Sequence, residues 1–198
     1  HVNQAGSLVN SQKLRFDFNH SQPVSSDEIH QIENMVNLQI AQADDVTQAE
    51  MSHQKAIDAG AVAMFGEKYG DDVRVIAMGK SKGNTFSMEL CGGTHVSNTS
   101  EIRIFKIVSE SGVAAGVRRI EAITGDRAFD YLNQLAQENL NVRQHLNAKK
   151  PKVDDETFAD SLLPRVNELQ EKIKNLEDRL KKHKTQSTKH RAQSTEQR

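Results

Sequence analysis

The pattern of hydrophobic and polar residues predicts a sheet in the first part of the chain. Apolar and polar residues alternate over 13–18, so Leu14, Phe16 and Phe18 share one face, which is typical of a half-buried strand. Four further segments are predicted to be strands. They are 73–78, 85–90, 102–109 and 117–124. A polar turn at 80–84 separates the first two of these four strands.

Two helices are expected among these strands. Ser25 is followed three residues later by Glu28, the capping-box pattern that begins a helix. The helix after it carries an apolar face at helical spacing. Its members are Ile29, Ile32, Val36, Ile40 and Ala43. A shorter helix is predicted over 51–58, ending near Gly60.

The chain changes character at Gly125, since all of its glycines lie at or before this position. A helix is expected over 127–146, then a polar, proline-containing break at 149–156. Beyond the break, apolar residues recur in alternating steps of four and three, the a/d pattern of a coiled coil. They are Leu162, Val166, Leu169, Ile173, Leu176 and Leu180. This pattern is short for an isolated coiled coil, so we interpret it as one arm of a helical hairpin. Pro164 must lie in the first turn of this helix or kink it.

Charge and composition exclude some classes of function. The 26 basic and 27 acidic residues nearly cancel, so no overall field marks the chain as a nucleic-acid or membrane binder. No apolar run approaches the ~20 residues that span a bilayer. The end of the chain, 181–198, is basic and almost free of apolar residues. We expect a disordered tail there, either a solvated terminus or a contact for RNA.

The single cysteine, Cys91, excludes an intrachain disulfide and fits a reducing compartment, so we expect a cytoplasmic location. The chain opens with His1 instead of Met, and no signal peptide is recognisable. We therefore expect a fragment of a longer protein.

The strongest local candidate for chemistry is the segment Cys91-Gly92-Gly93-Thr94-His95. Thiolate sulfur and imidazole nitrogen are ligands that Zn²⁺ prefers, and the two glycines permit a tight turn between them. Spacing alone leaves the alternative that Cys91 is a small buried hydrophobic residue. A zinc site also needs further ligands, and no HxxxH pair occurs among the other histidines.

Several basic residues are candidates for binding the phosphates of a nucleic acid. They are Lys80, Lys82, Arg118 and Arg119. A solvated hairpin and a strand end are equally good interpretations of these positions. The glycines of 112–116 do not form a P-loop, because the Gly-Lys-Ser/Thr ending is missing.

Five motifs, in this order, resemble the editing domain of the alanyl-tRNA synthetase family. They are HVNQAGSLV (1–9), LRFDF (14–18), FGEKYGD (65–71), CGGTH (91–95) and GVAAGVRRIEAIT (112–124). The resemblance covers about 1–146 and implies an α+β fold, with an antiparallel sheet packed on helices and a coiled-coil-like helical segment after it. Together with the composition, it divides the chain into four parts. These are the editing domain without its N-terminal portion (1–125), a connecting helix and linker (126–156), the coiled-coil-like helix (157–185) and a disordered basic tail (186–198).

The resemblance also implies a function. Members of this family attach alanine to its tRNA with ATP and Mg²⁺ in a separate N-terminal region, and their editing domain hydrolyses serine or glycine from wrongly charged alanine tRNA. It implies one Zn²⁺ per complete editing domain, held by Cys91, His95 and an HxxxH pair that in the family precedes the position of His1. Gln4 and Thr94 match positions at the editing pocket, so we treat them as candidate catalytic residues.

The partners implied are the acceptor end of alanine tRNA and the remaining portions of the same synthetase. Because half of the implied zinc site lies outside this sequence, we expect the isolated chain to be inactive. Two other interpretations stay open. One is a free-standing editing protein that deacylates tRNA in trans, and the other is a non-catalytic tRNA-binding or helical interaction module.

Overall fold

The computed structural model describes residues 2–63, 68–81, 84–148 and 162–195. The chain divides into two compact units, His1–Leu132 and Asn133–Arg198, which we describe separately. The start of helix α3 (Gly125–His145) belongs to the first unit, where Ala128 is fully buried. The boundary of the editing domain at 125 stays a prediction.

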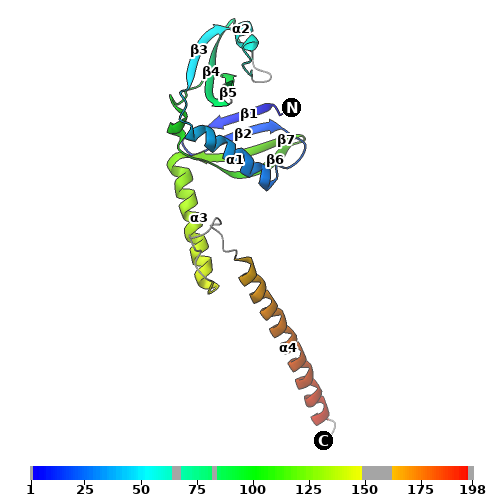
Figure 1. Cartoon of the computed structure of the whole chain (residues 1–198). Helices are drawn as coiled ribbons and strands as arrows, with labels where there is room; N and C mark the ends of the chain where they lie inside the picture. Colours follow the sequence, from blue (N-terminus) through cyan, green and yellow to red (C-terminus); the bar gives the residue numbers. More distant parts are fainter. Residues whose placement is uncertain (1, 64–67, 82–83, 149–161, 196–198) are drawn as a thin grey trace. The chain divides into compact units, whose positions relative to one another are not determined.

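A four-stranded antiparallel sheet forms the larger part of the first unit (Figure 1). Its strands, in spatial order, are β1 (Gln4–Val9), β2 (Leu14–Asn19), β7 (Val117–Thr124) and β6 (Phe105–Ala114). The strands predicted at 13–18 and 117–124 are confirmed, the first within one residue. The strand expected from 102 begins at Phe105 instead, because a 3-10 helix, η1 (Thr99–Ile102), precedes it.

Helix α1 (Ser26–Ala41) packs across one face of this sheet (Figure 1). The Ser25–Glu28 capping box is confirmed: the Ser25 hydroxyl accepts from the Glu28 amide, and the Glu28 carboxylate accepts from the Ser25 amide. Members of the predicted apolar face, among them Ile29 and Ile32, pack against a buried core from β2, β6 and β7. Ala43 is an error in that prediction: it lies beyond the helix, exposed, with a φ of +54°.

Two polar side chains of α1 also satisfy the outer backbone groups of the edge strand β6. The buried Glu33 carboxylate accepts from the Ile107 amide (2.7 Å) and from the Lys106 ammonium (2.8 Å). The Asn37 side chain accepts from the Phe105 amide and donates to the Phe105 carbonyl, at 2.8 and 2.9 Å. The helix thus closes an edge that would otherwise offer unpaired backbone groups to another strand.

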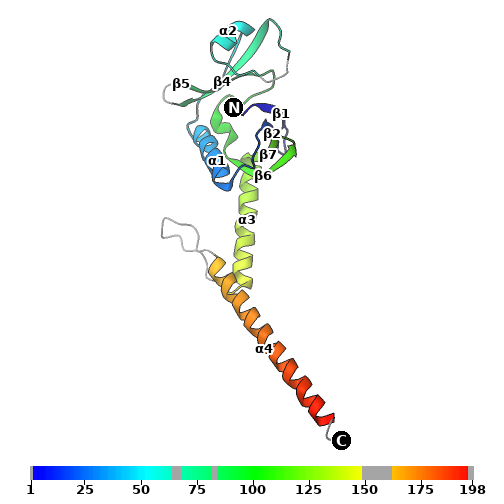
Figure 2. The same ribbon diagram turned by 90° about the vertical axis from the view of Figure 1, so that its right-hand side faces the viewer.

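The second sheet of this unit is also antiparallel, with the order β3 (Thr47–Ser52), β4 (Asp72–Ser81) and β5 (Asn84–Leu90). We expected one sheet, and the structure has two. The short helix α2 (His53–Asp58) packs on β3 and β4 (Figure 2). The core between them is small and consists of Ala56, Ala61, Val73, Val75 and Leu90.

Two details of this region differ from the sequence pattern. The helix predicted from 51 begins two residues later, because Met51 pairs with Val73 in the sheet and Ser52 caps the helix. The turn predicted at 80–84 is narrower, since Lys80 still pairs with Thr85 in the ladder. Its centre, 82–83, lies outside the described residues.

The second unit contains the rest of α3 and the long helix α4 (Leu163–Thr195). Pro164 lies in the first turn of α4, one of the two positions that the sequence left open. The start of α4 is tied to the end of α3, because the Arg165 guanidinium donates to the Leu146 carbonyl at 2.8 Å. The polar break at 149–156 lies outside the described residues, as does the expected helix start at 157.

Helix α4 differs from our prediction of a disordered tail at 186–198, because it continues through Thr195. No glycine or proline follows Pro164, and the Lys, Gln, Arg and Ala residues there are compatible with a helix. Three residues of the apolar stripe, Ile173, Leu176 and Leu180, are more than half exposed. Within the described ranges, no helix has the length and apolar content needed to cross a membrane.

Candidate functional site

A cavity of about 420 Å³ brings together two of the residues that the sequence singled out. Gln4 reaches it from β1, and Cys91 reaches it from the end of β5. The wall combines apolar side chains with two amides, a hydroxyl, a carboxylate and a thiol. Its residues are Val2, Asn3, Gln4, Ser7, Phe16, Val62, Ala63, Glu89, Leu90 and Cys91.

A bulge in β1 places Gln4 on this wall. Gln4 pairs with Phe18 and Gly6 pairs with Asp17, so one extra residue of β1 lies between these two pairs. In a regular strand Gln4 and Ser7 would face opposite sides, whereas the bulge puts both on one side. The Gln4 side-chain amide donates to the Ser7 hydroxyl at 2.9 Å. Sequence reasoning missed Ser7, because the hydrophobic pattern predicted no strand over this segment.

Cys91 begins the loop that follows β5. Its backbone amide donates to the Arg74 carbonyl at 3.1 Å, which continues the ladder between β4 and β5 by one residue. The Cys91 side chain is half-buried, and its sulfur lies beside Gly93. The sequence pattern did not mark Arg74 for a role in this loop.

The other two candidates in this segment lie apart from the cavity. Thr94 and His95 are both exposed, and neither is among the residues that line the cavity. The structure therefore brings Gln4 together with Cys91, and it does not bring Thr94 to them. The catalytic assignment of Thr94 stays a prediction that rests on the family motif.

Cys91 and His95 are residue types that zinc binds, but two ligands are too few to form a zinc site. Cys91 and His95 offer a sulfur and a nitrogen, whereas zinc sites take three or four ligands from protein. Among the described residues, no group of three or more His, Cys, Asp and Glu side chains is arranged to hold a metal.

We expect this chain, as it stands, to bind Zn²⁺ weakly or not at all. Two ligands leave the ion mostly hydrated, so a weak chelator will remove it. The check is the zinc content after dialysis against such a chelator, with Cys91→Ala as the matched control. One tightly held zinc per chain, absent from the control, would contradict this prediction and point to ligands not yet identified.

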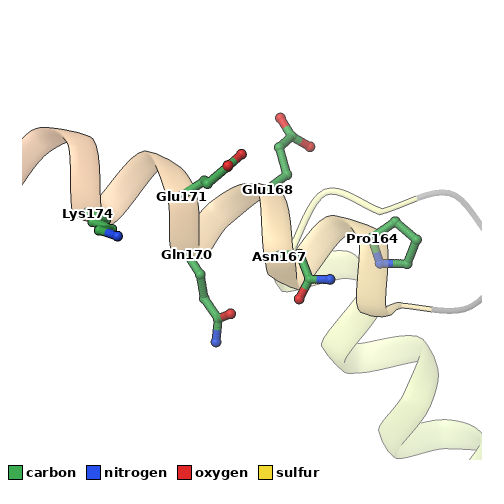
Figure 3. Close-up of a pocket in the computed structure, with 6 residues that line it drawn as sticks. All are labelled: Pro164, Asn167, Glu168, Gln170, Glu171 and Lys174. Atoms are coloured by element: carbon green, nitrogen blue, oxygen red, sulfur yellow. The ribbon is translucent and has the colours of Figure 1, made fainter.

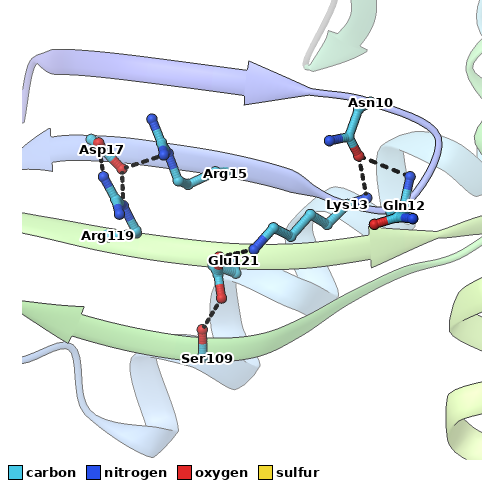
Figure 4. Close-up of polar contacts among 8 residues, drawn as sticks. All are labelled: Asn10, Gln12, Lys13, Arg15, Asp17, Ser109, Arg119 and Glu121. Atoms are coloured by element: carbon cyan, nitrogen blue, oxygen red, sulfur yellow. Dashed lines mark hydrogen bonds and ion pairs between the residues drawn. The ribbon is translucent and has the colours of Figure 1, made fainter.

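The two arginines proposed to hold tRNA phosphates are already paired within the sheet. The Arg118 guanidinium donates two hydrogen bonds to Glu110, both at 2.6 Å. Arg119 donates two to Asp17, both at 2.7 Å (Figure 4). These bonds lower the pKa of both carboxyl groups below its ordinary value. The geometry favours the strand interpretation of the arginines, and their contact with tRNA stays a prediction.

For the two lysine candidates, the structure gives less information than for the arginines. Lys80 lies in β4 opposite Thr85, and Lys82 lies outside the described residues.

On the sheet face that carries Arg119, the ammonium of Lys13 contacts Glu121, which also accepts from the Ser109 hydroxyl at 3.1 Å (Figure 4). This face is therefore a network of paired charges.

Other hollows in the molecule offer less chemistry. One lies along α4 and is formed by side chains of that helix alone, from Pro164 to Lys174 (Figure 3). Another, of about 430 Å³, lies between α1 and β2 and is mostly apolar, with Phe16, Phe18 and Met35 in its wall. The cavity shared by Gln4 and Cys91 is the better candidate site, because its polar groups converge on one small volume.

Comparison with known proteins identifies the class of domain first. Residues 73–121 match the family described as "Threonyl and Alanyl tRNA synthetase second additional domain". The matched range runs from β4 into β7 and includes Cys91 and His95. The chain thus contains an editing-type domain of the kind found in these synthetases.

Proteins that are similar over most of the chain then show that it belongs to the alanine–tRNA ligase family. The enzyme of Bdellovibrio bacteriovorus is 64% identical over 132 residues, which are 67% of this chain and 14% of that protein. The enzymes of Staphylococcus epidermidis and of a bovine strain of Staphylococcus aureus are 49% and 52% identical over 172 residues, 87% of this chain and 18% of each of theirs. The predicted resemblance to alanyl-tRNA synthetases is confirmed, and the chain spans 14–18% of the length of these relatives.

Proposed function

We propose that this chain carries the proofreading site of an alanyl-tRNA synthetase, which hydrolyses the ester of serine or glycine wrongly attached to alanine tRNA. The substrate is the charged acceptor end of that tRNA, and the location is the cytoplasm. Attachment of alanine, with ATP and Mg²⁺, belongs to other portions of the synthetase. The observation that carries the proposal is the cavity that Gln4 and Cys91 share.

The chemistry fits such a cavity. Water attacks the carbonyl carbon of the ester, the bond to the ribose oxygen breaks, and free amino acid and uncharged tRNA leave. The Gln4 amide can donate to the ester carbonyl or accept from the attacking water, while its bond to Ser7 holds the side chain in place. The apolar part of the wall limits the size of the amino acid that enters.

A second, hydrolytic site is reasonable for this substrate pair. Alanine, glycine and serine differ by a methyl or a hydroxyl group, and binding alone discriminates such differences by only about 10- to 200-fold. In the proposed complete domain, the family's HxxxH pair joins Cys91 and His95 around one Zn²⁺. The metal there would supply Lewis acidity or orient the terminal nucleotide.

The test uses a chimera in which the preceding region of the Staphylococcus epidermidis enzyme is fused in front of this chain. We expect it to release labelled serine from serine-charged alanine tRNA, and we expect Cys91→Ala to abolish the release while circular dichroism stays unchanged. A chimera that folds and releases no serine would contradict the proposal and favour the non-catalytic module. Equal rates with and without Cys91 would exclude this cavity as the site.

A further inference from the structure

Arg74 connects β4 to the loop that carries Cys91. Its guanidinium donates from Nε to the Cys91 carbonyl at 2.9 Å, and from Nη2 to the Gly93 carbonyl. In addition, the backbone carbonyl of Arg74 accepts a hydrogen bond from the backbone amide of Cys91. One residue of a regular strand therefore binds both ends of the tripeptide 91–93.

This tripeptide needs an external support. Gly92 and Gly93 have no Cβ, so their backbone has more conformational freedom than that of any other residue pair. A Cβ added at Gly92 would meet no atom within 4 Å, so packing does not restrict this position either. The bonds from Arg74 remove that freedom, and the planar guanidinium is suited to hold two carbonyl oxygens at once.

We infer that Arg74 is a positioning residue of the candidate site: it holds 91–93 in the conformation that keeps Cys91 on the wall it shares with Gln4. The importance of Arg74 for catalysis rests on the proposed function. Its role in holding the loop rests only on the two hydrogen bonds from its guanidinium group. A lysine in place of Arg74 keeps the positive charge, but its single ammonium does not provide the fork that both carbonyls need.

The lone cysteine makes a direct test possible. Because Cys91 is the single cysteine of the chain, a thiol reagent such as dithionitrobenzoate reports on this side chain alone. In the full chain, we expect Arg74→Lys to raise the labelling rate of Cys91 about tenfold, the factor for losing one hydrogen bond to a charged group. The matched control, Lys13→Gln, removes a cation that pairs with Glu121 on the other sheet, and it should label like the wild type.

The dependence of labelling on urea separates positioning from general stability. Local release of the loop exposes little surface, so the faster labelling should be insensitive to low urea concentrations. Gly92→Ala gives a second measurement that needs no change at Arg74. Alanine has less backbone freedom than glycine when the loop is released, so release becomes less favourable. Labelling should therefore slow about threefold.

Three results would overturn the inference. They are wild-type labelling in Arg74→Lys, labelling that rises only in proportion to the globally unfolded fraction, and no change in Gly92→Ala. None of these measurements needs activity. A chimera without serine release would refute the proposed function alone, and an active chimera should lose kcat in Arg74→Lys with little change in KM.

Discussion

Gln4→His should reduce serine release by the chimera about 100-fold, the order expected when a positioned hydrogen-bond donor is removed from a site that stabilises charge. The imidazole is wider than the amide and places its nitrogens differently, so both the bond to Ser7 and the contact with the ester are lost. No candidate metal ligand is removed. We therefore expect zinc content to stay at the level of the unsubstituted chimera.

The matched control for this prediction is Gln12→His, the same substitution at an exposed position of the turn between β1 and β2. It should leave serine release unchanged, since Gln12 does not line the cavity. Zinc and activity should be measured on the same preparation. A joint loss of both would mean that Gln4 maintains the architecture of the site, and full activity would remove Gln4 from the pocket.

Glu33→Ala should lower the free energy of unfolding of the chain by about 3 kcal/mol, which is among the larger effects of single substitutions. The change leaves the Ile107 amide and the Lys106 ammonium without their carboxylate partner, in a site where Glu33 is 7% exposed. The melting temperature should fall by about 10 °C. Urea unfolding followed by circular dichroism gives the free energy of unfolding from its midpoint and slope, and thermal unfolding gives the melting temperature.

A graded series makes this prediction specific. Glu33→Gln keeps an acceptor for the Ile107 amide and loses the charge opposite Lys106, so its cost should be about half that of alanine. Asn34→Ala, at an exposed position of the same helix, should change stability by less than about 0.5 kcal/mol. Equal stability of Glu33→Ala and Asn34→Ala would show that the edge of the sheet does not need the carboxylate.

The sequence predicted those elements that local chemistry determines. Strand β7 was predicted with its observed bounds, which a glycine flanks on each side, at Gly116 and Gly125. The capping box at Ser25 was predicted as well, since its hydrogen bonds are local. Five motifs, with 91–95 among them, identified the family, and the relatives confirmed it.

Where the prediction was wrong, long-range pairing had overridden local preference. Met51 is in a strand because Val73 pairs with it, and no feature of 51–58 by itself reports that partner. The division into two sheets likewise depends on which strands meet. In the sequence, nothing near Arg118 and Arg119 indicates a carboxylate partner, because their partners lie on neighbouring strands.

By itself, the sequence determined the class of domain, the cap of α1, most of the strands and the two candidate residues Gln4 and Cys91. The tertiary structure alone decided that these two residues share a cavity, because a bulge in β1 reverses the side that Gln4 would otherwise face. It also decided that Arg74 holds the Cys91 loop and that Glu33 closes the sheet edge. The physical reason is that such contacts join residues far apart in the chain, so no local periodicity records them.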